Sequence, residues 1–239
     1  MLYLEHVKKI FGGNEALSDV SFTINQSDFV GLIGPNGSGK TTLINCISGL
    51  LVPTSGKIRF ENRSIIGLSP PKIYRMGIGR TFQISKVFGR LSVYDNLRIP
   101  SITIGKTDER EIRRKSESIL SSLHLESYAD VTANSLSGGQ KKLLELGMIM
   151  MSEPQILLLD EPFGGVHPEL KKQFENYLSQ LNYSGKTIIL VSHEMSTVFR
   201  ICPRLVVLDR GVVVADGSPS EIQSNDRVVK AYLGGKHGA

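Results

Sequence analysis

The sequence predicts an α/β fold with a central parallel sheet. Its short apolar runs, typical of strands buried on both faces, lie near residues 29–33, 78–82, 156–159, 187–191 and 204–208. Segments suited to helices alternate with several of these runs, as they do where helices join parallel strands. Because 239 residues can bury a good core, we expect one domain over residues 1–239.

The first 60 residues predict an antiparallel sheet beside the central one. Apolar residues alternate with other residues on both sides of a glycine-rich turn at residues 12–14. Leu2, Leu4 and Val7 precede the turn, and Val20, Phe22 and Ile24 follow it. Residues 56–60 indicate a further short strand. We therefore expect an antiparallel β subdomain.

Residues 92–150 interrupt the alternation of strands and helices. Ile112, Ile119, Leu120 and Leu123 fall on one stripe of an amphipathic helix, and Asp108 is placed to cap its start. We expect an α-helical subdomain over roughly residues 84–150. The end of the chain predicts a hairpin at residues 204–216, a helix at residues 218–224, a terminal helix that ends at residues 232–233, and frayed residues 234–239.

The segment after the first apolar run matches the phosphate-loop pattern G-x-x-x-x-G-K-[ST] at every fixed position. This phosphate loop (residues 34–42) consists of Gly34, Pro35, Asn36, Gly37, Ser38, Gly39, Lys40, Thr41 and Thr42. Its glycines let the backbone approach an anion, and the following helix adds partial positive charge. We expect Lys40 to reach the β- and γ-phosphates, Thr41 to ligate Mg²⁺ and Thr42 to bind the α-phosphate. The alternative is a glycine-rich turn without a ligand.

Two acids, Asp160 and Glu161, follow the apolar run at residues 156–159. An acid at the carboxyl end of a parallel strand lies where open α/β sheets bind ligands. We expect Asp160 to hold Mg²⁺ through a water molecule, and Glu161 to act as the general base for an attacking water. The alternative is an ordinary acidic exit from a strand.

Gln83 and His193 each follow another predicted strand of the same sheet. The Gln83 amide can touch Mg²⁺ or the attacking water, and the His193 imidazole can donate to the γ-phosphate. For His193, the alternative is an ordinary solvated or packed histidine.

A second segment suited to phosphate opens a helical run at residues 141–151. This signature segment (residues 136–140) consists of Leu136, Ser137, Gly138, Gly139 and Gln140. A serine at a helix start caps the helix, and the N–H groups there can bind an anion.

In order and spacing, these elements resemble the ATP-binding subunits of ABC transporters over essentially the whole chain. The resemblance implies a P-loop NTPase core of the ABC ATPase type that uses ATP and Mg²⁺. It also implies that the signature segment binds the γ-phosphate of ATP held by a second ATP-binding subunit, so that ATP joins the two and hydrolysis separates them. Phe11 falls where the family places an aromatic on adenine, and a core position is the alternative.

The resemblance implies further partners: transmembrane permease subunits, a substrate-binding protein, and a second ATP-binding subunit that is either a copy of this chain or a different one. We expect the permease to dock near residues 84–98. Val87, Phe88 and Leu91 either face it or pack inside the helical subdomain. His167 departs from the family, which usually has Asp or Asn there, so communication between the two sites could be altered.

Within the family, several segments resemble the branched-chain amino-acid uptake group. They are residues 11–13, 16–17, 80–83 and 231–234. The compact stretch before the signature segment fits that group less well, and residues 91–97 resemble the lipopolysaccharide-export ATPases. We therefore expect branched-chain amino-acid import, with lipopolysaccharide-type export as the alternative.

The composition is that of an ordinary globular protein, with 40% hydrophobic and 21% charged residues. No apolar stretch is long enough to span a bilayer, and the N-terminal residues do not resemble a signal peptide. Cys46 and Cys202 are unpatterned and lie among aliphatics, which suits a reducing compartment. We expect a cytoplasmic protein that is peripheral on the inner face of the cell membrane.

Two other classes of function fit the sequence less well. A net charge of +5 suits nucleic acid as well as anionic lipid, but the basic residues are dispersed and no aromatics interleave them. A cytosolic ABC ATPase acting on nucleic acid usually has long coiled-coil arms or two such domains, so we expect no nucleic-acid partner. A GTP-dependent switch would carry Asn-Lys-x-Asp, which is missing, and would leave the signature segment unexplained.

Overall fold

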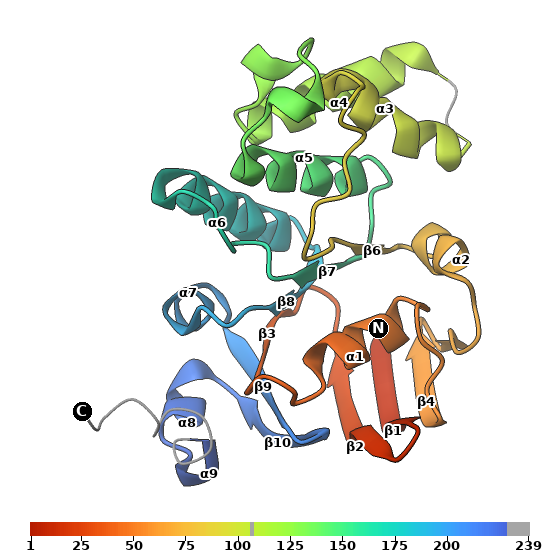
Figure 1. Cartoon of the computed structure of the whole chain (residues 1–239), viewed down its shortest axis with the longest axis vertical. Helices are drawn as coiled ribbons and strands as arrows, with labels where there is room; N and C mark the ends of the chain where they lie inside the picture. The colour runs from red at the N-terminus through yellow and green to blue at the C-terminus, as the bar shows by residue number, and fades with distance from the viewer. Residues whose placement is uncertain (106–107, 229–239) are drawn as a thin grey trace. The chain divides into compact units, whose positions relative to one another are not determined.

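The computed structural model describes residues 1–105 and 108–228. The chain divides into two compact units, one formed by Met1–Tyr74 with Thr187–Ala239 and the other by Arg75–Lys186. Figure 1 labels the helices and strands of both units. That residues 1–239 form one domain stays a prediction.

The first unit contains the predicted antiparallel sheet. Strand β1 (Leu2–Phe11) pairs with β2 (Asn14–Ile24) on one side and with β4 (Ser55–Phe60) on the other, and β4 pairs with the short β5 (Arg63–Ser64). All six residues of the predicted alternation are buried. Helix α1 (Lys40–Ile47) packs beside β2, with Leu43, Ile44, Cys46 and Ile47 buried (Figure 1).

Three parallel strands and the antiparallel neighbour of one of them form the rest of the sheet in the first unit. Strand β3 (Phe29–Ile33) lies between β8 (Thr187–Val191) and β9 (Arg204–Asp209) and is parallel to both. Strand β10 (Val212–Gly217) pairs antiparallel with β9 and parallel with β2, so it joins the two parts of the sheet. Every residue of β3 and β8 is buried, as expected for strands covered on both faces.

Short helices complete the first unit. They are α7 (Met195–Ile201), α8 (Pro219–Gln223) and α9 (Asp226–Val228), and α2 (Pro70–Arg75) leads into the second unit. Ser218 caps α8 with Glu221 as its reciprocal partner, which confirms the predicted helix. The predicted terminal helix, the frayed residues 234–239 and the segment 231–234 lie outside the described residues.

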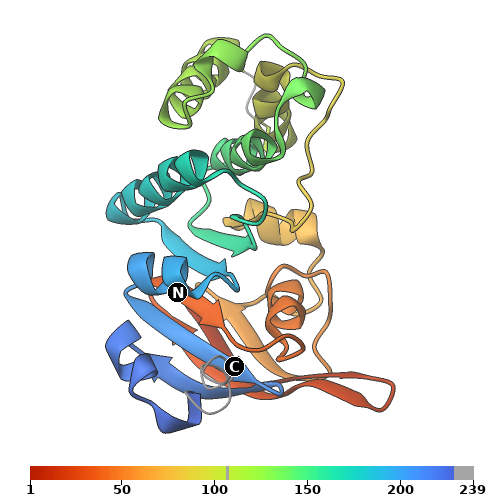
Figure 2. The same cartoon turned by 60° about the vertical axis from the view of Figure 1, so that its left-hand side comes forward.

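The second unit combines two parallel strands with four α-helices and two short 3₁₀ helices, Glu126–Tyr128 and Ala133–Ser135, in its described part. The strands are β6 (Ile78–Arg80) and β7 (Ile156–Asp160), and the α-helices are α3 (Val93–Thr103), α4 (Glu109–Ser122), α5 (Gly138–Met150) and α6 (Pro168–Tyr183). Helices α3 and α4 pack on α5, and α5 runs beside α6 in both views (Figure 1, Figure 2). As predicted, Asp108 caps α4, and Ile112, Ile119, Leu120 and Leu123 are buried.

The segment that follows β6 exposes several apolar side chains. Phe88 is 49% exposed and Leu91 38%, whereas Val87 is half-buried. Ile84, which the sequence did not single out, is 77% exposed. In the parts of the chain that the structure describes, no helix has the length and apolar character needed to cross a membrane.

Candidate functional site

The phosphate loop connects β3 to α1 in the first unit. Two of its glycines leave room where a side chain would clash: a Cβ on Gly34 would lie 2.0 Å from the Leu208 carbonyl oxygen, and one on Gly39 2.6 Å from that of Ala16. Gly39 also has φ +104, a conformation that favours glycine. The loop is therefore packed between β9 and β2, and only glycine fits at these two positions.

The Lys40 side chain folds back over the loop that precedes it. Its ammonium donates to the carbonyl oxygens of Gly34 and Pro35, each at 2.8 Å, and lies 3.4 Å from the Ser38 hydroxyl. Thr41 is exposed, and Thr42 is half-buried. A cation held by uncharged carbonyls can exchange them for phosphate oxygens, because an acceptor of opposite charge binds an ammonium more strongly than a neutral one does.

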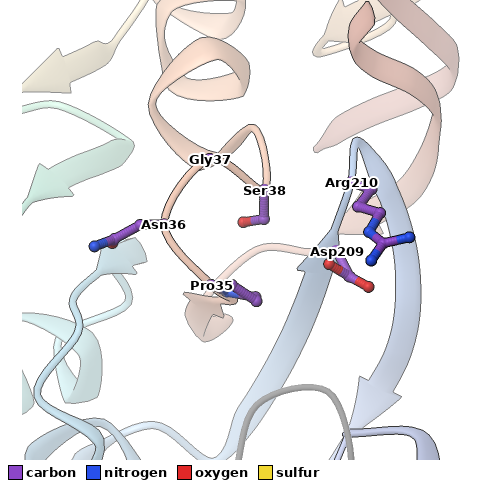
Figure 3. Close-up of a pocket in the computed structure, with 6 residues that line it drawn as sticks. All are labelled: Pro35, Asn36, Gly37, Ser38, Asp209 and Arg210. Atoms are coloured by element: carbon purple, nitrogen blue, oxygen red, sulfur yellow. The ribbon is translucent and has the colours of Figure 1, made fainter.

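A cavity of about 320 Å³ lies beside the loop. Its lining comes from Pro35, Asn36, Gly37 and Ser38 on one side, and from Asp209 and Arg210 on the other. Figure 3 shows the loop and the turn at Asp209 and Arg210 facing each other. The turn is tied to the loop, because the Gly211 N–H donates to the Ser38 carbonyl at 3.0 Å. The sequence predicts a hairpin at residues 204–216, but no local pattern places its turn beside the phosphate loop.

His193 and Phe11 belong to the same unit as the phosphate loop. Val191 pairs with Leu32, so His193 and the loop emerge from the same edge of the sheet. His193 is exposed. Phe11 is 44% exposed, which excludes the core position, and the Lys9 ammonium lies 5.0 Å from its ring centroid.

Gln83, Asp160 and Glu161 belong to the second unit. Arg80 pairs with Leu158, so the segments that carry Gln83 and the two acids leave the parallel pair β6 and β7 at the same edge. Gln83 is exposed, Asp160 is buried and Glu161 is half-buried. Glu161 has φ +51, which is uncommon for a residue with a side chain and marks a constrained turn.

A buried ion pair holds Asp160. Arg80 donates from Nη2 to its Oδ2 at 3.2 Å, and the two side chains are 8% and 6% exposed. Burial lowers the pKa of the Arg80 guanidinium, and the Asp160 carboxylate opposes that change. The sequence does not predict this role of Arg80, because no local pattern indicates which acid it meets.

The signature segment forms the start of α5 in the second unit, with Ser137 as the N-cap. The Ser137 hydroxyl accepts from the Gln140 N–H at 3.3 Å, and the Gln140 amide oxygen accepts from the Ser137 N–H at 2.9 Å. Ser137 and Gly138 are exposed. Gly139 is buried, and a Cβ there would lie 2.7 Å from the Leu170 side chain, so glycine fits best at this position. The predicted cap is confirmed.

The donors predicted for Mg²⁺ are a hydroxyl (Thr41), an amide (Gln83) and a carboxylate (Asp160). Such oxygen ligands suit Mg²⁺. Asp160 is already held beside one cation in the structure, that of Arg80, so its environment tolerates positive charge. Within the described ranges, no three or more His, Cys, Asp or Glu side chains gather where they could hold a metal ion.

Comparison with known proteins identifies a family. The sequence profile of a family described as ABC transporter matches residues 17–164, and that of the branched-chain amino acid ATP-binding cassette transporters matches residues 212–238. The chain is 36% identical to the probable branched-chain amino acid transport ATP-binding protein LivG of Methanocaldococcus jannaschii, over 98% of this chain and 97% of the relative.

Solved structures agree in fold. A nucleotide-free ATP-binding cassette from an ABC transporter has a TM-score of 0.88 and 35% identity, covering 97% of this chain and 98% of its own. A dimeric cassette in a post-hydrolysis state, bound to ADP and Pi, has a TM-score of 0.82 and 28% identity, covering 92% of this chain and 99% of its own. The predicted P-loop NTPase fold of the ABC ATPase type is thereby confirmed.

Proposed function

The chain belongs to the family of ABC transporter ATP-binding proteins, and we propose that it powers the import of branched-chain amino acids. It binds and hydrolyses ATP as a subunit of a dimeric cassette. The observation that carries the substrate class is the match of residues 212–238 to the branched-chain group, in a segment separate from the phosphate loop. The comparisons do not favour lipopolysaccharide-type export.

In this proposal the first unit holds the nucleotide. The phosphate loop binds the phosphates through its N–H groups, Lys40 exchanges its carbonyl partners for β- and γ-phosphate oxygens, and Thr42 binds the α-phosphate. Phe11, which is 44% exposed, stacks on adenine. His193, which leaves the same sheet edge as the loop, donates to the γ-phosphate.

The second unit supplies the groups for hydrolysis. Glu161 takes the proton of the attacking water, and Gln83 orients that water. Thr41, Gln83 and Asp160 would hold Mg²⁺. When bound, this ion would neutralise part of the negative charge of the phosphates. Ser137, Gly138, Gly139 and Gln140 bind the γ-phosphate of the nucleotide in the second subunit, with N–H groups at the start of α5.

We further propose that the subunit works on the inner face of the cell membrane, docked on permease subunits and fed by a substrate-binding protein. The exposed side chains of Ile84, Phe88 and Leu91 suit such a permease contact.

Reconstitution tests the proposed function. The chain is placed in vesicles together with permease subunits and a substrate-binding protein of the branched-chain amino-acid type, and uptake of radiolabelled leucine is measured with and without ATP. We expect ATP-dependent uptake that is lost with Glu161→Gln. Absence of leucine uptake by vesicles whose ATPase is active would contradict the substrate class, and absence of ATPase activity would contradict the enzyme function.

A further inference from the structure

Helix α5 reaches two loops of the second unit with side chains that lie one turn apart. Lys142 and Glu145 both extend from the helix that begins at Ser137. We propose that α5 positions both catalytic loops of this unit: Lys142 holds the Glu161 loop (residues 161–166), and Glu145 holds the Gln83 loop (residues 82–86). The inference rests on the proposed function, since it assigns these residues to the same reaction.

Lys142 binds the Glu161 loop by its backbone. Its Nζ donates to the Glu161 carbonyl oxygen at 3.0 Å and to the Gly164 carbonyl oxygen at 2.7 Å. The loop is also a turn in itself, since the Gly164 N–H lies 3.4 Å from the Glu161 carbonyl oxygen. One ammonium thus joins both ends of the turn that gives Glu161 its positive φ of 51°. A strained conformation persists only when its surroundings hold it, and Lys142 is one such support.

Glu145 binds the Gln83 loop in a comparable way, with the opposite charge. Its Oε1 accepts from the Phe82 N–H at 3.3 Å and from the Lys86 N–H at 3.2 Å. These two N–H groups stand on either side of Gln83, so a single oxygen fixes both ends of the loop. Glu145 is only 4% exposed, which makes these acceptor bonds costly to lose.

The neighbouring lysine shows that this arrangement is specific to one position. Lys141 lies next to Lys142 on α5, yet its ammonium donates to the Asn134 carbonyl oxygen, at 3.1 Å, in a segment that carries neither Gln83 nor Glu161. A solvated lysine would need no pair of carbonyl partners. Lys142, which is half-buried, has two.

The consequence is a rigid connection between the signature segment and the two loops that carry Glu161 and Gln83. Ser137 caps the same helix whose next turns carry Lys142 and Glu145. A nucleotide of the second subunit that binds the helix start therefore contacts the element that also holds Glu161 and Gln83. Neither Lys142 nor Glu145 touches the reacting atoms, so both are positioning residues.

Lys142→Met tests the Glu161 loop. Methionine keeps an unbranched side chain and removes both donors. We expect kcat for ATP to fall about 10-fold, because small misplacements of a catalytic group are costly. The Kd for ATP should be unchanged, since the phosphate loop belongs to the first unit. Lys172→Met, an exposed lysine of α6, is the matched control and should keep the parental kcat.

Glu145 is tested by a pair of variants. Glu145→Gln keeps an accepting Oε1, whereas Glu145→Met removes it at similar length. We expect kcat within about twofold of the parent for Gln and about 10-fold lower for Met. Amide hydrogen exchange without nucleotide gives a second readout: Phe82 and Lys86 should exchange faster in the Met variant and at the parental rate in the Gln variant.

The outcomes separate this inference from the proposed function. If the parent hydrolyses ATP while Lys142→Met and Glu145→Met keep its kcat and its exchange rates, the positioning role is overturned and the function stands. If the parent hydrolyses no ATP, the function is wrong and the positioning role falls with it. Should Glu145→Met fail to fold, Lys142→Met decides, together with exchange at residues 163–166 in that variant.

Discussion

The phosphate loop of the first unit and the two catalytic loops of the second are held in shape by different means. Backbone packing fixes the phosphate loop, because Gly34 and Gly39 fit against the carbonyls of Leu208 and Ala16. Side chains hold the other two. Arg80 pairs with Asp160, and α5 reaches both loops with Lys142 and Glu145.

This difference suits the two tasks. A loop that cradles an anion needs N–H groups in a fixed array, and a glycine-rich backbone packed closely against neighbouring backbone supplies one. Loops that must place a base and a water need support at particular residues, which the side chains of a neighbouring helix provide. We therefore expect variants in the two regions to separate nucleotide binding from turnover.

The largest expected effect is that of Glu161→Gln, which removes the base and keeps the shape. Turnover should fall about 10²- to 10⁴-fold, as is usual when a general base is lost. Dimers formed with ATP should persist, because the phosphate loop is untouched. Phosphate release and size-exclusion chromatography with ATP measure the two quantities, and Glu169→Gln on α6 serves as the control. Turnover at the parental rate would exclude Glu161 as the base.

Arg80→Met is expected to have the next largest effect, on stability. It leaves the Asp160 carboxylate buried without its cation, and breaking a buried pair costs about 3 kcal/mol of the free energy of unfolding. Denaturant unfolding measures the loss. In the double variant Arg80→Met, Asp160→Asn, much of that stability should return, because no charge stays buried. A double variant no more stable than the single one would contradict this account of the pair.

Lys40→Ala should act on binding in the first unit. Charge-assisted bonds to phosphate contribute about 1.5–3 kcal/mol, so the Kd for ATP should rise about 10- to 100-fold. Isothermal titration measures it, and Lys57→Ala, which removes an exposed lysine from the same unit, is the control. Unchanged affinity for ATP in Lys40→Ala would contradict the proposed contact of Lys40 with the phosphates.

The most gradual expected effect is a dependence of stability on pH that belongs to the second unit. Burial raises the pKa of Glu145 from 4.5 to about 7, although its bonds to the Lys86 and Phe82 N–H groups and the charges of Lys142 and Lys86 lower it. Between these values the folded state keeps a proton that the unfolded state releases. Stability contributed by this group therefore falls as pH rises from 4.5 to about 7, and is constant above that range.

The slope of this effect is at most about 1.4 kcal/mol per pH unit. Glu145→Gln cannot titrate at this position, so its free energy of unfolding should decline less than that of the parent over the same range. Denaturant unfolding at a series of pH values gives the comparison. Identical pH profiles for parent and variant would show that Glu145 is ionised to the same extent in both states.

The sequence by itself determined the strands, the phosphate loop and the cap of α5. The residues that decide these features are neighbours in the chain. A phosphate loop is encoded by nine consecutive residues, 34–42, and its chemistry comes mainly from the backbone. The buried strands show in uninterrupted apolar runs such as Thr187–Val191, and Ser137 with Gln140 forms a local capping box.

Only the tertiary structure decided which side chains support the catalytic loops. Arg80 meets Asp160 across 80 positions of sequence, and Glu145 meets Phe82 across 63. The turn that carries Arg210 lies beside the phosphate loop for the same reason, since β9 pairs with β3. Such contacts follow from how helices and strands pack, and packing joins residues that no local pattern relates.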